Sequence, residues 1–489
     1  MPARTGAEYL EGLRGQPREV WLDGRRVDDI VDEPAFRAPI RRLAELYDLQ
    51  HAPANADTCL HASPTSGDPV ATAFLVPRTY DDLVQRRHAF EAFARHTYGL
   101  MGRSPDFLNT TVMAFAEARD VFARGGERFG RNVVDYYEHV RENDLFLTHA
   151  LISPQIDRSR TSADQSERFL HLGVVDETSD GIIVHGARML ATLAPMADEL
   201  LIYNLPGLRQ GDEDHAVAFA VPLHAPGLRI ICRQAYDDGT SSSFDHPLGH
   251  TFEETDALVV FDQVHVPWER VFVYRDVALA NAMYSETNLR QHTAHQTNVR
   301  GLVKCQLVAG VAMALATAIK VDGFLHVQRS LGEMVGHLEM IKSGIARAEH
   351  EYETAADGTI RCRFEPLQTL RAYLARVYPE MVESLQTMGA GGLMIVPSEA
   401  DFVGGVADDV QRYFQGAEGL GAVDRARIFR IAADLTMSAF GSRLVQYERY
   451  YAGDPVRLVA GNYLGYDKAD CLALVEHVSA LAGDPVHTA

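Results

Sequence analysis

The sequence predicts a mixed α+β protein with three successive parts: a helical N-terminal domain, a central β-domain and a C-terminal helical bundle. Apolar residues in the first and last parts recur at three- and four-residue steps, the spacing of an amphipathic helix. The middle part instead contains short segments rich in Val, Ile and Phe, separated by turn signals, which is typical of strands. We place the three domains at residues 1–145, 146–275 and 276–489.

The composition excludes two classes of partner. The chain has 489 residues and a formal net charge of −21, and such a surface repels nucleic-acid phosphates and anionic membranes. Its five cysteines are widely spaced and form no CxxC pair, which favours neither a disulfide framework nor a zinc site. The polar N-terminus lacks the apolar core of a signal peptide. We therefore expect a soluble protein of the reducing cytoplasm, with no metal.

The N-terminal domain is predicted to contain helices over residues 80–97, 109–122 and 132–140, where charged residues alternate with spaced apolar ones. Between the first two, Ser104 fits a helix N-cap, Pro105 fits the first helical position, and Asp106 suits the positive end of the helix dipole. The pattern therefore places Arg103 just before a helix N-terminus.

The central domain is predicted to hold short strands over residues 169–175, 181–185, 216–222, 228–233 and 257–261. Turn signals such as Ser179-Asp180-Gly181 and Asp237-Asp238-Gly239 separate them. Short strands with such turns indicate an antiparallel barrel or sandwich.

The C-terminal domain is predicted to be a bundle of long helices with short connections. Leu331, Met334, Leu338 and Ile341 mark one amphipathic helix. The apolar run over residues 307–319 is shorter than the about 20 residues that span a bilayer, so we expect a buried core helix. Residues 432–451 are predicted to form a further long helix.

Several common nucleotide-binding and catalytic motifs are missing from the sequence. No GxGxxG follows a predicted strand, no GxxxxGK[ST] occurs, and there is neither a GxSxG nor an HExxH. A redox enzyme of this sequence has no visible nicotinamide domain, so its electrons must come from another protein.

Six stretches, in chain order, carry a family resemblance. They are residues 99–107 (GLMGRSPDF), 147–158 (LTHAL followed by PQIDR), 186–195 (GARMLATLAP), 260–272 (VFD followed by VPWERVF), 389–397 and 447–455 (YERYY followed by GDP). Together they resemble the large-component family of 4-hydroxyphenylacetate 3-monooxygenases, relatives of the acyl-CoA dehydrogenases. The resemblance spans nearly the whole chain and agrees with the helix–β–helix order.

The resemblance implies an acyl-CoA dehydrogenase-like fold with a C-terminal four-helix bundle, assembled as a homotetramer or homodimer. It also implies an aromatic monooxygenase that uses O2 and reduced FAD, supplied by a separate NAD(P)H-flavin reductase, to hydroxylate a phenol beside its hydroxyl through a flavin C4a-hydroperoxide. Phenolate reacts far better than phenol in such chemistry, and a free phenol has a pKa of about 10. The site therefore needs a base or a positive charge.

The resemblance assigns catalytic roles to Arg103, His149 and His295. Arg103, always protonated and forked, is expected to hold the substrate hydroxyl. His149 is expected to bind the phenolic oxygen or to position flavin, and His295 to act as the base, with His292 as its solvated neighbour. Phe107 stands where the family usually has Tyr, which removes one hydroxyl from the substrate pocket.

Further residues carry expected binding roles. Asn204 and Leu205 are expected to contact substrate, and the loop at 206–215 to cover it. Thr192 is expected to lie beside the reactive edge of the flavin. The other expected FAD contacts are Ala150, Leu151, Gln155, Ile156, Asp157, Arg158, Ala452, Gly453, Asp454 and Pro455.

Other readings remain open for the sequence alone. An acyl-CoA dehydrogenase-like flavoenzyme would need a carboxylate base above the flavin, and a 4-hydroxybutyryl-CoA dehydratase-like lyase would need cysteine ligands for an iron–sulfur cluster. A non-catalytic flavin-binding protein is the third alternative. The identity of the phenol, free or tethered to a carrier, is open as well.

Overall fold

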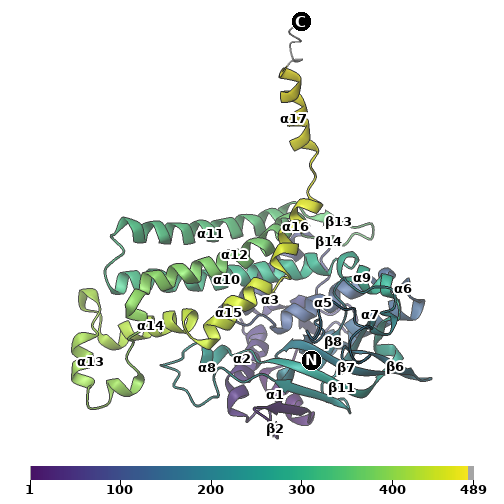
Figure 1. Ribbon diagram of the computed structural model, residues 1–489, viewed down its shortest axis with the longest axis horizontal. Coiled ribbons are helices and arrows are strands. Elements are labelled where there is room, and N and C mark those ends of the chain that lie inside the picture. Colours follow the sequence, from purple (N-terminus) through teal and green to yellow (C-terminus); the bar gives the residue numbers. More distant parts are fainter. Residues whose placement is uncertain (1, 483–489) are drawn as a thin grey trace.

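The computed structural model describes residues 2–482 and confirms the predicted α+β class, with helical, β and helical parts in that order (Figure 1). The long helices α10 (Leu289–Ala318), α11 (Leu325–His350) and α12 (Phe364–Gly389) form one layer. The sheets and the N-terminal helices pack together below this layer in the view of Figure 1.

The N-terminal part is mainly helical, and its central helix α5 (Pro105–Glu117) is buried at every position from Pro105 to Phe115. The predicted helix at 109–122 is in fact two helices, α5 and α6, which meet at Ala118. The remaining elements are α1 (Gly6–Gly15), β1 (Glu19–Leu22), β2 (Arg25–Val27), α2 (Pro34–His51), α3 (Ala56–Cys59), β3 (Leu60–Ala62), β4 (Pro69–Ala71), α4 (Tyr80–His96), α6 (Arg119–Ala123) and α7 (Glu127–Asn143).

The central part contains two sheets with strand orders β2-β1-β10-β11-β7-β6 and β12-β9-β8-β5. Parallel pairing of β1 with β10, and of β5 with β8, corrects the expectation of a wholly antiparallel sandwich. The predicted strand at 169–175 starts later, at Gly173. The strands are β5 (Leu147–His149), β6 (Gly173–Glu177), β7 (Gly181–Thr192), β8 (Glu199–Ile202), β9 (Val217–Pro222), β10 (Leu228–Cys232), β11 (Asp256–Pro267) and β12 (Val271–Tyr274).

The C-terminal part is the predicted helical bundle, in which α12 contacts α10, α11, α14 (Ala422–Thr436) and α15 (Ala439–Tyr450). Helix α10 has the length and composition to cross a membrane, yet most of its apolar stretch is buried inside the protein, as expected for a core helix. The smaller elements are α8 (Gly249–Phe252), α9 (Val277–Glu286), β13 (Glu353–Thr354), β14 (Ile360–Arg361) and α13 (Ala407–Tyr413).

The single helix expected over residues 432–451 is wrong, because α14 ends at Thr436 and α15 begins at Ala439. Ser438 lies between them with extended backbone angles, and its hydroxyl accepts the N–H of Gly441 at 3.0 Å. This N-cap starts a new helix where the apolar pattern alone runs on.

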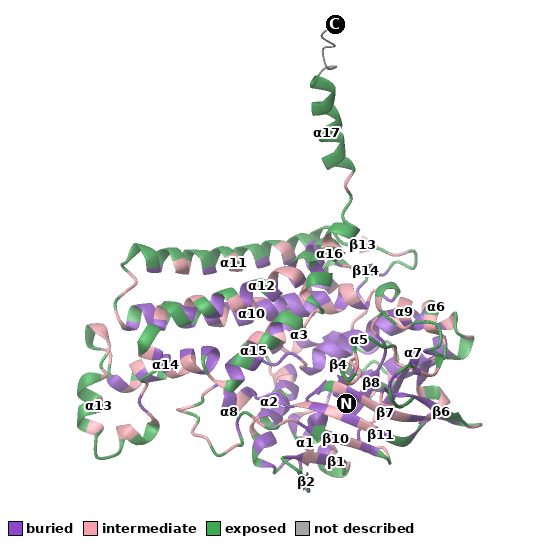
Figure 2. Cartoon of the chain, in the orientation of Figure 1, coloured by how far each residue is buried: buried purple, intermediate pink, exposed green. Residues whose placement is uncertain are grey.

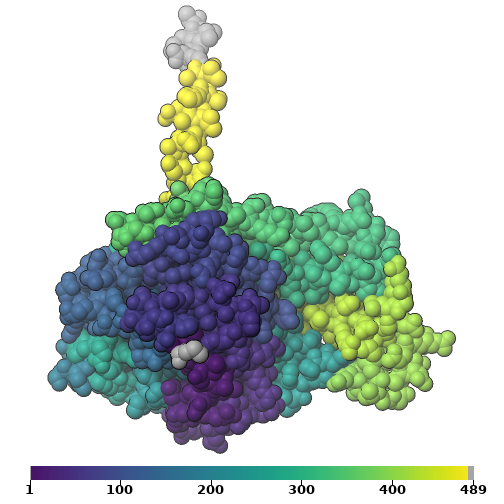
Figure 3. Space-filling model, turned by 180° about the vertical axis from the view of Figure 1, so that it is seen from behind, coloured from purple at the N-terminus to yellow at the C-terminus, as the bar shows by residue number. Residues whose placement is uncertain are grey.

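Two helices complete the described chain, α16 (Pro455–Gly465) and α17 (Ala469–Leu481). Helix α17 projects away from the body and is exposed along its length (Figures 1 and 2). The opposite, space-filling view also shows it standing clear of the other elements (Figure 3). It carries five exposed large apolar side chains: Leu472, Leu474, Val475, Val478 and Leu481.

Candidate active site

The segment that precedes α5 begins with a glycine that no other residue can replace without strain. Gly99 has a φ of +69°, and a Cβ there would lie 2.7 Å from the backbone oxygen of Arg300. Ser104 and Pro105 occupy the predicted N-cap and first helical positions of α5. The Ser104 hydroxyl donates to Asp106 at 2.5 Å instead of capping the helix. The local sequence thus presents Arg103 at a tight turn into a buried helix.

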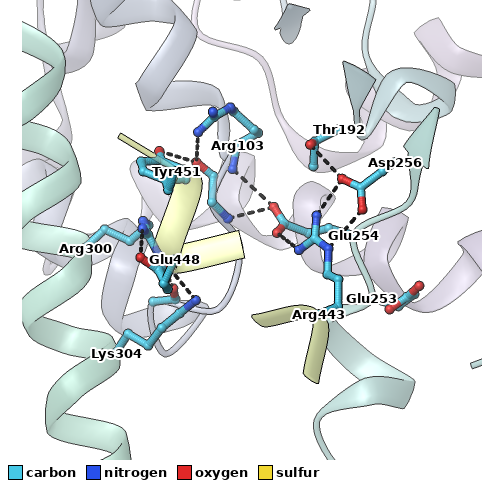
Figure 4. Close-up of polar contacts among 12 residues, drawn as sticks. Arg103, Thr192, Glu253, Glu254, Asp256, Arg300, Lys304, Arg443, Glu448 and Tyr451 are labelled. Atoms are coloured by element: carbon cyan, nitrogen blue, oxygen red, sulfur yellow. Dashed lines mark hydrogen bonds and ion pairs between the residues drawn. The ribbon is translucent and has the colours of Figure 1, made fainter. Parts of the chain in front are cut away.

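A buried carboxylate from the β-domain holds this segment from one side. Glu254, which is 0% exposed, accepts the backbone N–H groups of Gly102 at 2.6 Å and Arg103 at 3.2 Å (Figure 4). Arg443 of α15 donates to Glu254 at 2.7 Å and to both oxygens of Asp256 at 2.7 and 3.0 Å. The backbone at Arg103 is therefore tied to two domains through charge-assisted hydrogen bonds.

A second buried ion cluster holds the segment from the bundle side. Glu448 accepts hydrogen bonds from Arg300 and Lys304, each at 2.8 Å, and Arg300 also donates to the Gly99 carbonyl at 2.9 Å (Figure 4). Burial raises the pKa of Glu448, but the two cations outweigh burial and lower it to about 2. The Tyr451 hydroxyl donates to the Gly102 carbonyl at 2.7 Å.

The Arg103 guanidinium is enclosed on its faces but not fully bound at its edge. Its carbon lies 4.2 Å from the ring centroid of Tyr451 and 4.4 Å from that of Phe107. Nε donates to His149 Nε2 at 3.1 Å, and Nη1 makes one long bond, 3.4 Å, to the Gly102 carbonyl. Within residues 2–482, Nη2 has no hydrogen-bond acceptor, so it can bind an oxyanion.

The Arg103 guanidinium stays positively charged despite its burial. Burial lowers its pKa, but attraction to Tyr447, Tyr451 and Glu254 outweighs burial and raises the pKa above the ordinary value. The group therefore stays cationic at any working pH.

His149, the last residue of β5, is a neutral imidazole in this arrangement. Nε2 accepts from Arg103, so the ring proton resides on Nδ1 and is donated to the Tyr203 hydroxyl at 3.0 Å. Burial, and then the adjacent Arg103 charge, hold the pKa of His149 well below its usual range. The structure brings His149 and Arg103 together as expected, and the neutral ring connects Arg103 to Tyr203.

Phe107 lies in the same cluster. Its ring packs edge-on against His149 at 5.8 Å between centroids and against Tyr451 at 5.9 Å. The ring walls the site, but it offers no hydrogen bond to a ligand.

Thr192 ends β7 beside strained backbone. Its hydroxyl donates to Asp256 at 2.8 Å, so this group can only accept from a ligand (Figure 4). Leu190 and Leu193, on either side, have φ values of +63° and +62°, a conformation that is costly for leucine and that concentrates at functional sites. Leu190 is 51% exposed, so an apolar side chain faces outward next to Thr192.

The other expected FAD contacts lie on two separate segments. Ala150 and Leu151 follow β5, and Gln155, Ile156, Asp157 and Arg158 continue that loop, with Ile156 53% exposed. Ala452, Gly453, Asp454 and Pro455 join α15 to α16, where Asp454 caps α16 and Gly453 has a φ of +123°. Ala452 accepts a hydrogen bond from Arg371 at 2.6 Å.

Asn204 and Leu205 start the loop that is expected to cover substrate. The Asn204 amide is used within the protein, because it donates to the His215 carbonyl and accepts from the Val217 N–H, both at 3.2 Å. The loop is fastened to α9 by Asn281, which accepts the N–H groups of Gly207 and Leu208 at 2.8 and 3.0 Å. The substrate contacts of Asn204 and Leu205 stay predictions.

His295 lies elsewhere in the bundle. It bonds Glu349 of α11 at 2.7 Å and packs edge-on against Phe90 of α4. Burial lowers its pKa, but Cys362 and Glu349 raise it to about 9 overall. None of these partners belongs to the Arg103–His149 cluster, so the geometry gives no support for the predicted base, which stays a prediction. His292 is buried, not solvated, and pairs with Glu117 at 2.7 Å.

Tyr203, Glu254, Asp256 and Arg443 were not singled out from the sequence. Each joins the site through a contact with a residue far along the chain, as with Glu254 and Arg103, which are 151 residues apart. Tyr203 follows an apolar strand, and the run Glu253-Glu254-Thr255-Asp256 reads as a polar loop. Only the unusual density of acidic residues before β11 offered a sequence signal.

Comparison with known proteins identifies the family of this chain. Family models for the N-terminal and C-terminal parts of 4-hydroxyphenylacetate 3-hydroxylase match residues 5–273 and 280–479. The chain is 42% identical to the 4-hydroxyphenylacetate 3-monooxygenase oxygenase component of a Geobacillus species, over 96% of this chain and 94% of that one. It is also 42% identical to the Thermus thermophilus oxygenase component, over 95% of each chain.

A crystal structure of the oxygenase component HpaB with FAD and 4-hydroxyphenylacetate superimposes with a TM-score of 0.93 at 41% identity, covering 98% of this chain and 99% of that one. An archaeal 4-hydroxybutyryl-CoA dehydratase shares the fold alone, with a TM-score of 0.87 at 22% identity. The resemblance found in the sequence is therefore confirmed over both halves of the chain, which belongs to the 4-hydroxyphenylacetate 3-hydroxylase family.

Proposed function

We propose that this chain is the oxygenase component of a two-component aromatic monooxygenase, which hydroxylates a phenol at the carbon beside its existing hydroxyl. Family membership and the activities named for the Geobacillus and Thermus relatives support this function. The observation that carries it is the Arg103 guanidinium, which is fixed by His149 and two aromatic rings while no acceptor in the described part of the chain bonds Nη2.

Arg103 favours the reactive form of a phenol. A guanidinium donor stabilises the phenolate and therefore lowers the pKa of the bound phenol. His149 has too low a pKa to keep the released proton, so that proton leaves to solvent. Electron density from the oxyanion then enriches the adjacent ring carbon, which is the carbon that is oxidised.

The residues present fit FAD. Leu190 on β7 near Thr192, and Ile156 on the loop after β5, expose apolar side chains, which suits a flat aromatic ring system. Gln155 and Arg158 have no protein hydrogen-bond partner among residues 2–482, and Arg158 carries the charge that a diphosphate needs. Thr192 and the loop at 452–455 would hold the rest of the cofactor. Reduced FAD, when bound, supplies the two electrons that activate O2.

The carboxylates near Arg103 are not free to act as the base of an acyl-CoA dehydrogenase. Such an enzyme needs a free carboxylate base, whereas Glu254 and Asp256 are both held by Arg443. This geometry favours the monooxygenase over that alternative, and the intact Arg103–His149 pair argues against a non-catalytic flavin-binding protein.

We also propose two kinds of protein partner. An NAD(P)H-flavin reductase supplies reduced FAD, since the sequence shows no nicotinamide fingerprint. A second copy of the chain covers α17, because five exposed large apolar side chains on one projecting helix are costly in water (Figures 2 and 3). The homotetramer or homodimer expected from the family would provide this cover.

The test is oxygen incorporation by the purified chain with a flavin reductase, NADH and a panel of phenols under ¹⁸O2. We expect one labelled oxygen beside the original hydroxyl of a preferred phenol, and R103A is expected to release hydrogen peroxide with little catechol. A chain that forms no labelled catechol from any phenol with reduced FAD, or that reduces an acceptor dye with acyl-CoA, would refute the proposal.

A further inference from the structure

Thr192 presents a hydroxyl oxygen whose proton is already committed within the protein. It ends β7 and is 4% exposed, and its hydroxyl donates to Asp256 Oδ1 at 2.8 Å (Figure 4). No donor among residues 2–482 bonds the same oxygen. Its lone pairs are therefore available to a ligand, and they can bind only a ligand group that donates a hydrogen bond.

The direction of the bond between Thr192 and Asp256 is fixed by the cations around Asp256. Arg443 donates to Oδ1 at 2.7 Å and to Oδ2 at 3.0 Å, and Arg233 donates to Oδ2 at 3.2 Å. Burial raises the pKa of Asp256, but the two guanidinium groups outweigh burial and lower it below the ordinary value. An ionised carboxylate has no proton to give, so Thr192 must be the donor.

The backbone around Thr192 is held as firmly as its side chain. The Thr192 carbonyl accepts the Thr148 hydroxyl at 2.6 Å, and the next residue, Leu193, donates its N–H to the Thr255 carbonyl at 2.8 Å. Leu193 keeps a left-handed φ of +62°, a strained conformation that its neighbours must maintain. Thr148 directly precedes His149 in β5, so Thr192 is a neighbour of the Arg103–His149 cluster.

We propose that Asp256 is a positioning residue that makes Thr192 a hydrogen-bond acceptor for the N5–H of reduced FAD, so that the site selects the reduced cofactor. The inference rests on the proposed function, because a flavin that serves a phenol beside Arg103 must face that phenol with its reactive edge. N5 belongs to that edge, and Thr192 neighbours the same cluster. The contact makes and breaks no covalent bond and moves no electron.

The redox state of a flavin changes the hydrogen-bonding character of N5 but not that of N3. In the reduced ring N5 carries a proton and can donate it to Thr192, whereas in the oxidised ring N5 offers only a lone pair. That lone pair would meet a second acceptor, the Thr192 oxygen, which is unfavourable in a buried site. N3–H donates in both states, so a contact with N3 would give no preference. Thr192 is therefore selective only through N5.

The experiment measures the dissociation constants of oxidised and reduced FAD on the full chain, without O2 or phenol, together with the midpoint potential of bound FAD. Wild type is expected to bind reduced FAD more tightly, which raises the midpoint potential above that of free FAD. T192V keeps the shape of the side chain but removes the oxygen. The preference for reduced FAD is expected to fall about 10-fold, which is about 30 mV for a two-electron couple. T192S keeps the hydroxyl and is expected to keep the preference.

The variant D256N tests the positioning role of Asp256. Its amide has one acceptor oxygen, which the Nε groups of Arg443 and Arg233 hold at the Oδ2 position. The amide NH2 then donates to Thr192, whose own proton becomes available to oxidised N5. D256N is therefore expected to lower the preference at least as far as T192V. The matched control, E253Q, removes a buried carboxylate that bonds Arg233 at 2.7 Å without contacting Thr192, and it should keep the preference.

A single-atom change in the cofactor separates N5 from the other flavin atoms. Oxidised 5-deaza-FAD has a C–H group without a lone pair at this position, so wild type is expected to bind it more tightly than oxidised FAD, and T192V should not. An unchanged preference in T192V or D256N, equal weakening of both redox states in T192V, or equal losses in D256N and E253Q would overturn the inference, while ¹⁸O incorporation would still support the proposed function. If wild type binds FAD in neither redox state, the proposed function fails instead.

Discussion

Substitution of Glu254 by Gln tests whether the buried carboxylate positions Arg103. The carboxylate accepts two backbone N–H groups on Oε1 and the Arg443 guanidinium on Oε2. A glutamine keeps one acceptor oxygen for the backbone and turns an NH2 group towards Arg443, so one charge-assisted bond becomes a donor–donor contact. Asp256 still pairs with Arg443. We expect a loss of about 3 kcal/mol of unfolding free energy, within the range for breaking a buried charged bond.

The functional effect of E254Q should exceed its effect on stability alone. Looser backbone at Arg103 displaces the guanidinium from the phenolic oxygen, so catechol formed per O2 consumed should fall and hydrogen peroxide should rise. The matched control is E253Q. Glu253 is equally buried and bonds Arg233 at 2.7 Å, but it has no contact with the Arg103 segment.

Equilibrium urea unfolding and the ratio of catechol to peroxide measure the two effects separately. We expect both variants to be destabilised and only E254Q to lose coupling. Equal coupling in E254Q and wild type, or equal loss of coupling in E254Q and E253Q, would refute the positioning role of Glu254.

Three further outcomes follow from the ion clusters and the projecting helix. The pKa of Glu448 is lowered to about 2, whereas that of an unfolded Glu is about 4.3. The stability that Glu448 contributes is therefore present above pH 4.3 and is lost as the pH falls towards 2. In E448Q, the free energy of unfolding should fall by about 3 kcal/mol less than in wild type over this pH range. His295 has a pKa raised to about 9, so the stability it contributes is present below about 6.5 and is lost as pH rises through 9; urea unfolding of H295Q should show a flatter pH dependence over that window. Removal of residues 469–489 should lower the oligomeric mass seen by light scattering, and an unchanged mass would show that α17 is not an interface.

Local sequence patterns were sufficient for the turn that presents Arg103. Ser104 and Pro105 are strong helix-start signals, and the structure places both at the predicted positions. The order of helical and β parts was also visible, because the apolar period changes along the chain. The break between α14 and α15 could not be predicted from the sequence, because the Ser438 cap lies inside a continuous apolar pattern.

Contacts between distant residues could not be predicted from periodicity. Arg443 and Glu254 are 189 residues apart, and neither residue type indicates its partner. The same limit applies to the partner of His295, because Glu349, which it bonds, comes from the next helix. The tautomer of His149 likewise depends on Arg103 and Tyr203, which only the fold brings together.

The most direct test of the account is the ionisation state of a phenol bound beside Arg103. The anion of 4-nitrophenol absorbs visible light and its acid does not, so a pH titration of the bound ligand with reduced FAD, without oxygen, reports its pKa. Wild type should bind the anion with a pKa lowered by about one unit or more relative to free 4-nitrophenol, and R103Q should lose that shift. A ligand bound as the neutral phenol, or an identical shift in R103Q, would contradict the central claim.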